Sequence, residues 1–283
     1  MPHGKHHRYR RNMKTRSCFA IASYLVGILL LHATACAHGA PQGLPLASNV
    51  LARLVQRAAH VAKDGKAEKY TYEKRSLLEE LNAEAAVMRS TEKLYKVVLI
   101  QGWPFSRLIK IQGRELSEAE IRKEDQREQE FRNKIAGRDL SKRAEREAAG
   151  ITPEVVARYN FKVLSQDLYQ NRMTLVLDFT PKASNPENTI PDRIYNRLAG
   201  RIWVDDEDAE IAKMDVHLTE DLSLGWLGVL GSLRECHLIL ERQRLSDAIW
   251  VNAKQSLVLV GRKLLKSMRF RAIEESTGFH REP

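Results

Sequence analysis

Two histidines stand in neighbouring predicted strands, where their side chains could reach the same ligand. A register that pairs Lys213 with Glu241 places His217 opposite His237 on the polar face, with carboxylates nearby at Glu220 and Glu235. Two imidazoles and a carboxylate form a zinc-binding set. No close-spaced ligand pair accompanies them, so we expect two solvent-facing histidines and no metal site.

A cysteine and an acidic run also invite a chemical interpretation. Cys236 alternates with apolar residues, so we expect a small core residue and not a nucleophile. The acidic run Asp205, Asp206, Glu207 and Asp208 lacks the oxygen spacing of a calcium loop. We therefore expect these four residues to form a solvated turn after a strand.

The chain lacks the common catalytic and nucleotide-binding motifs. It has no G-x-S-x-G, no H-E-x-x-H and no phosphate-binding glycine loop, and no nucleophile stands beside a base at a recognisable spacing. We expect no catalytic residue, no enzymatic activity and no cofactor.

One connecting segment, residues 222 to 233, is unusually apolar (LSLGWLGVLGSL). Its large apolar side chains could form a flap over a cavity or a lip that touches a membrane. The alternative is an ordinary loop that folds onto the protein's own core. The predicted turn that holds Trp103 and Phe105 supplies a second candidate rim of a binding site. Alternatively, these two side chains pack in the core. The candidate hydrophobic ligand-binding residues are Trp226, Leu227, Val229, Leu230, Trp103 and Phe105.

The first 37 residues predict export. Six basic residues precede an apolar run from Cys18 to Leu31, too short for a membrane span, and Ala35-Cys36-Ala37 follows. We expect a signal peptide over 1–37 cleaved after Ala37; the alternatives are an uncleaved anchor and lipidation at Cys36. The chain is expected in the periplasm or cell envelope.

Composition limits the class of partner. The formal charge of the 283 residues is +10, but the expected leader carries six of the basic residues and no acidic one. The remaining net charge, near +4, is too small to indicate a nucleic-acid-binding surface, so we expect no nucleic-acid partner. The few cysteines predict no disulfide framework.

Periodicity predicts the remaining elements. Residues 38–65 hold a linker and an amphipathic helix from Ser48 to Ala62, and 66–276 alternate as strands. A capping box at Ser117 and Glu120 opens a helical insertion over about 117–149, in which 18 of the 30 residues from Glu118 to Glu147 are charged. Residues 277–283 form a tail.

These elements predict an α+β fold. A long antiparallel sheet should curl into an open half-barrel, covered by the N-terminal helix and carrying the charged insertion. We expect a concave apolar interior between this sheet and the helix.

Two segments resemble a known family. Gly102 to Ser117 (GWPFSRLIKIQGRELS) and Leu198 to Asp208 (LAGRIWVDDED) are similar to signatures of LolA-like bacterial envelope proteins, within the LolA/LolB superfamily. The resemblance covers about residues 66 to 280 and implies an open β-barrel, a cavity for acyl chains and a role in lipoprotein sorting. The charged insertion departs from the carrier proteins proper, so the resemblance does not carry their partner-docking surfaces over to this chain.

The expected function is non-catalytic binding of lipid, acyl chains or another hydrophobic ligand in the half-barrel. The alternative is a structural or regulatory envelope module whose charged insertion docks a protein partner. Peripheral membrane contact is compatible with either function. An envelope hydrolase would need a nucleophile–base pair that the sequence does not show.

Overall fold

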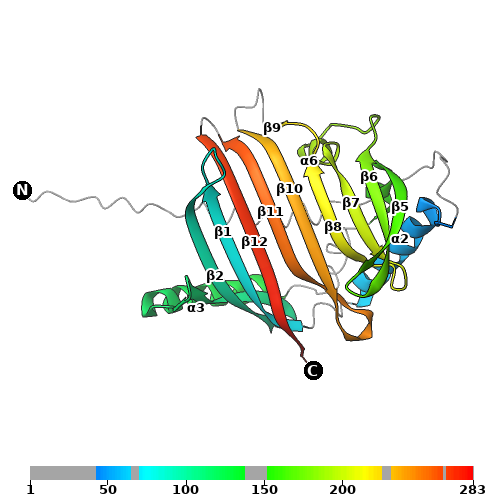
Figure 1. Cartoon of the computed structure of the whole chain (residues 1–283). Helices are drawn as coiled ribbons and strands as arrows, with labels where there is room; N and C mark the ends of the chain where they lie inside the picture. Colours follow the sequence, from blue (N-terminus) through cyan, green and yellow to red (C-terminus); the bar gives the residue numbers. More distant parts are fainter. Residues whose placement is uncertain (1–42, 65–69, 138–151, 225–230, 264–265, 283) are drawn as a thin grey trace, which may run out of the picture.

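The computed structural model describes residues 43–64, 70–137, 152–224, 231–263 and 266–282, and the fold is given for these ranges. A single antiparallel sheet of twelve strands curls across the molecule without closing (Figure 1). Its order is β4-β3-β2-β1-β12-β11-β10-β8-β7-β6-β5, with the short β9 paired to β10. The predicted open half-barrel of an α+β protein is thereby confirmed.

The strands lie between residues 70 and 281, and β12 continues to Arg281, through residues that were expected to form a tail. Their bounds are β1 Tyr70–Leu81, β2 Val87–Ile100, β3 Trp103–Ile111, β4 Arg114–Glu115, β5 Tyr159–Tyr169, β6 Arg172–Pro181, β7 Leu198–Asp205, β8 Ile211–Leu218, β9 Leu222–Leu224, β10 Gly231–Arg244, β11 Trp250–Lys263 and β12 Lys266–Arg281.

The register between β8 and β10 is the predicted one. Lys213 pairs with Glu241, Met214 with Leu240, and His217 with His237. A slip of one residue would turn the apolar side chains of β8 to solvent, so burial and charge select the same alignment.

Helices border the sheet at both ends (Figure 1). Their bounds are α2 Ala47–Asp64, α3 Glu118–Ile135, α5 Pro153–Val156 and α6 Ile190–Tyr195, with a 3-10 turn at Ser246–Ala248. The predicted capping box is present at the start of α3, where Ser117 and Glu120 satisfy each other's backbone N–H groups. Within the described ranges, no helix combines the length and apolar character that crossing a membrane requires.

Helix α2 packs on the sheet through its apolar face. Leu51 and Leu54 of α2 are 2% and 0% exposed and join a core with Tyr159, Leu177 and Leu238 from the strands. Apolar residues on the two facing elements thus form an ordinary core, and a ligand cavity at this helix stays a prediction.

Helix α3 covers an edge of the sheet. Because β4 is only two residues long, most of β3 has no strand on its outer side. The buried Glu124 accepts a hydrogen bond from the Leu108 backbone N–H at 2.9 Å, and Arg127 donates to the Ser106 carbonyl. Side chains of α3 thus satisfy edge groups that would otherwise attract a strand from another chain.

Gly200 allows β7 and β8 to approach closely. A Cβ atom at this position would lie 2.0 Å from the carbonyl oxygen of Asp215 and 2.9 Å from the Cα of Val216. Gly200→Ala should therefore lower the free energy of unfolding by about 2 kcal/mol or more, because backbone must move. Urea denaturation measures this loss.

Gly278→Ala is the matched control for that substitution. Gly278 has φ +65° and open space around its Cα, so alanine there should cost only the backbone strain, about 1 kcal/mol. Equal losses in the two variants would contradict a specific clash at Gly200.

Candidate functional site

A groove of about 570 Å³ lies between α3 and the concave side of the first strands. Its volume falls within the range of about 300 to 1,000 Å³ that is typical of small-molecule sites. The groove is at the opposite end of the sheet from α2, and the core that α2 joins extends to it at Leu78, which lines the groove.

Two strands build the floor of the groove. Alternate side chains of a strand share one face, so β2 contributes three residues and β1 three more. Ladder pairing brings them together as Leu78 with Thr91, Ser76 with Lys93, and Lys74 with Tyr95. The floor is therefore polar at Ser76, Thr91 and Lys93 and aromatic at Tyr95.

The opposite wall comes from α3 and the edge strand. The rings of Phe105 and Phe131 lie 5.1 Å apart, and the guanidinium of Arg127 stacks 4.3 Å from the Phe105 ring centre. Leu108 faces the groove beside them. This wall is an apolar surface with a cation stacked on one of its rings.

The groove contains seven charged side chains whose pairing is uneven. Lys74 Nζ lies 3.5 Å from Glu274 Oε1, and Arg127 pairs with Glu124. Glu130, which lines the helix wall, accepts a hydrogen bond from Gln126.

Two lysines that line the groove take part in neither of these ion pairs. Across the described part of the chain, no ion pair is recorded for Lys93 or Lys134. Burial raises the pKa of Tyr95, so its phenol stays neutral beside these charges. The groove thus joins neutral aromatic surface to unpaired positive charge.

Of the predicted rim residues, two are described. Phe105 is 2% exposed and lines the groove, while Trp103 packs with it on Ile100 and Ile135. The sequence left open whether these residues line a rim or pack in a core. Phe105 lines the groove and also packs in the small core with Ile100 and Ile135. The other candidates, Trp226, Leu227, Val229 and Leu230, lie outside the described residues, as do Cys36 and Ala37.

The paired histidines have a different carboxylate neighbour from the one predicted. His237 Nε2 lies 2.7 Å from Asp215 Oδ1, across the β8–β10 ladder, and both side chains are partly exposed. No group of three metal-ligating side chains gathers anywhere in the described ranges.

Cys236 occupies the core, as its alternation predicts. It is 3% exposed and free of any disulfide. Burial raises the pKa of its thiol to about 12, so the sulfur is protonated and unreactive at neutral pH.

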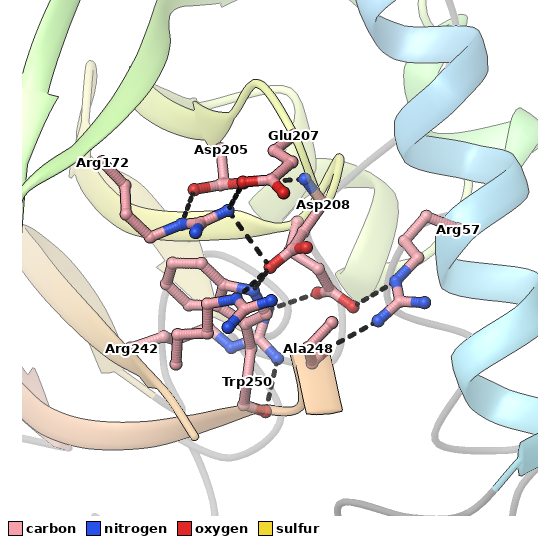
Figure 2. Close-up of polar contacts among 10 residues, drawn as sticks. Arg57, Arg172, Asp205, Glu207, Asp208, Arg242, Ala248 and Trp250 are labelled. Atoms are coloured by element: carbon pink, nitrogen blue, oxygen red, sulfur yellow. Dashed lines mark hydrogen bonds and ion pairs between the residues drawn. The ribbon is translucent and has the colours of Figure 1, made fainter. Parts of the chain in front are cut away.

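The acidic run after β7 is not the solvated turn that its composition predicts (Figure 2). The Asp205 side chain is 1% exposed and receives two hydrogen bonds from Arg172, at 2.5 and 2.8 Å. Asp208, whose side chain is 8% exposed, accepts from Arg244 and from Trp250 Nε1 at 2.6 and 2.8 Å. Arginines from other strands cover Asp205 and Asp208, while the Glu207 side chain stays exposed.

This buried ionic cluster also anchors α2. Glu210 Oε1 accepts from Arg57 of the helix at 3.0 Å, and Glu210 Oε2 accepts from Arg242 at 2.9 Å (Figure 2). Burial alone would raise the pKa of Asp208, but hydrogen bonds from Arg244 and Trp250 outweigh it and lower that pKa. Because every carboxylate in the cluster is paired with arginine, we assign it a structural role and not a catalytic one.

The sequence did not identify the floor of the groove. Lys93 and Tyr95 belong to the segment KLYKVVLIQ, whose alternation predicted a strand but not which face would remain open. Their partners on β1 lie about twenty residues earlier in the chain, and α3 closes the other side. The strand alternation placed Lys93 and Tyr95 on one face; nothing in it pointed to a cavity there.

Comparisons with known proteins find similarity at the level of structure only. No family model matches the chain, and no curated protein does. A DUF1329 family protein from Desulfovibrio piger is 11% identical over 82% of this chain and 93% of its own, with a TM-score of 0.31. A domain titled as an outer membrane lipoprotein-sorting protein from Vibrio parahaemolyticus is 9% identical over 81% and 93%, with a TM-score of 0.29.

A LolA superfamily protein from Nitrosomonas europaea is 10% identical over 80% of this chain and 94% of its own, with a TM-score of 0.24. The structures to which this chain is similar therefore include a member of the superfamily that the two sequence segments resemble. At such TM-scores the similarity supports no conclusion about function. The argument for a function therefore rests on the groove.

Proposed function

We propose that this chain is an exported protein of the periplasm or cell envelope that binds the apolar chain of a lipid-like ligand without catalysis. The binding site is the groove between α3 and strands β1 to β3. The observation that supports this proposal is an open space of about 570 Å³ with aromatic side chains on two sides.

The apolar surface of the groove provides the driving force. Tyr95 comes from the floor, and Phe105, Leu108 and Phe131 come from the opposite wall. A ligand chain that removes apolar surface from water gains about 25 cal/mol for each Å² buried. Several kcal/mol are therefore within reach without any reacting group, before the cost of immobilising the ligand is subtracted.

Filling the groove tests this function. Thr91 lies on the floor and has no recorded side-chain hydrogen bond in the described ranges, so Thr91→Trp should occupy the space that a ligand chain needs. We expect affinity for a fluorescent fatty-acid probe to fall about tenfold or more, since one large ring excludes several methylene groups. Fluorescence titration measures the affinity, and native mass spectrometry of protein from its own envelope should show co-purifying lipid.

Ser90→Trp is the matched control. Ser90 is the neighbouring residue of β2 and points to the other face of the sheet, where it is exposed. Its substitution should leave probe binding unchanged. Equal affinity in the Thr91 and Ser90 variants, or no binding by the unmodified protein, would refute the proposed site.

A further inference from the structure

We infer that the groove selects an amphiphile with an anionic head group, a carboxylate or a phosphate, which binds at Lys93 beside the hydroxyls of Ser76 and Thr91. The inference rests on the proposed function and adds the chemistry of the ligand's polar end.

The three polar residues form one contiguous donor surface. Ser76 is the direct ladder partner of Lys93, and Thr91 precedes Lys93 by two positions on the same strand. Directly paired residues on one face have Cβ atoms about 5 Å apart, and residues two apart on a strand lie about 7 Å apart. An ammonium and two hydroxyls at these spacings can donate together to the oxygens of one anion.

The charges around Lys93 leave it without a counterion. The other charged side chains that line the groove are three carboxylates and three cations. Glu274 is paired with Lys74, and Glu124 is paired with Arg127. Glu130 and Lys134 stand one turn apart on α3 and offset each other in charge. The groove thus has a net charge of +1, and Lys93 is the cation on its floor for which the described ranges show no ion pair.

Partial burial makes this charge a binding determinant. Lys93 is half-buried, and no ion pair is recorded for it in the described ranges. Its ladder neighbour Ser76 is only 5% exposed. A lysine that has lost part of its hydration gains more from an anionic partner than an exposed one does, because the surrounding dielectric is lower.

The polar and aromatic parts of the groove are arranged in sequence. Tyr95 follows Lys93 by two residues on β2, and Phe105 and Phe131 continue the apolar wall toward α3. A head group at Lys93 would leave its chain against these rings. The order of donor surface and apolar wall fits a single-chain amphiphile better than a wholly apolar molecule.

The experiment compares ligands that differ only in their head groups. Dodecanoate, dodecyl phosphate, dodecanol and dodecylammonium are titrated calorimetrically, below their aggregation concentrations, into the unmodified protein and into Lys93→Met. The unmodified protein should bind the two anions about tenfold or more tighter than the alcohol, as a charge-assisted hydrogen bond provides. Lys93→Met should remove that preference and leave the affinity for the alcohol unchanged.

Lys96→Met is the matched control, and Lys93→Arg should keep the preference for anions. Lys96 lies on the same strand, exposed on the opposite face, so its loss should change none of the four affinities. Equal binding of dodecanoate and dodecanol would overturn the head-group inference while leaving the proposed function intact. Absence of binding by all four would overturn the proposed function as well.

Inorganic phosphate alone distinguishes a free anion from an amphiphile. We expect it to bind far more weakly than dodecyl phosphate, because it buries no apolar surface. Equal affinity for the two would overturn the inference, since the donor surface would then act as a plain anion site.

Discussion

Asp205→Ala should lower the free energy of unfolding by about 3 to 5 kcal/mol, the loss typical of breaking a buried ion pair by removing one partner. The Asp205 side chain is 1% exposed and holds Arg172 by two hydrogen bonds, and it also accepts from the Asp208 backbone N–H at 2.7 Å. Alanine would leave this N–H without its carboxylate and would remove the most buried partner of Arg172, which keeps Glu207 at 2.9 Å and Asp208 at 3.5 Å. Urea denaturation followed by circular dichroism measures the change.

Glu118→Ala is the control for that experiment. Its pair with Arg122 spans 3.5 Å, and the two side chains are 91% and 71% exposed, so its loss should cost about 0.5 kcal/mol or less. A loss below about 1 kcal/mol for Asp205→Ala would show that the cluster does not hold the turn as the structure indicates.

Leu54→Ala should cost about 2 to 5 kcal/mol, because it empties a fully buried site that the sheet cannot collapse to fill. Leu54 is 0% exposed and belongs to the core that α2 forms with the strands. Thermal unfolding and urea denaturation both measure the loss.

Gln56→Ala tests whether the loss is specific to the buried face of α2. Gln56 lies two residues further along the helix and is exposed, so alanine there should change stability by about 0.5 kcal/mol at most. Similar losses in the two variants would mean that the helix is weakly docked. Affinity for the fatty-acid probe should be the same in both, since the groove lies at the other end of the sheet.

Local patterns were sufficient to predict the sheet and one of its registers. Alternation marked the strands, and the charges of Lys213 and Glu241 selected the same pairing as the apolar residues between them. The capping box at Ser117 likewise depends on residues three positions apart. Each of these features arises from neighbours along the chain or from one adjacent strand, which a sequence displays directly.

The acidic run at 205–208 shows where such patterns fail. Four consecutive acidic residues predict exposure, yet Arg172, Arg244 and Trp250 come from other strands to bury two of them. Exposure of a charge depends on which opposite charges the fold brings to it, and those partners lie about forty residues away in the chain.

By itself, the sequence determined an antiparallel sheet too long to stay flat, an amphipathic helix and a charged one, because periodicity and capping are local. Only the tertiary structure decided that α2 packs into the main core at its end of the sheet while α3 leaves a groove at the other. The difference arises from packing. Three leucine and valine side chains of α2 meet an apolar face of the sheet. Helix α3 instead docks on the edge strand β3, through Glu124 and Arg127 and through a small separate core that holds Phe131 and Ile135, and leaves the groove open beside β1 and β2.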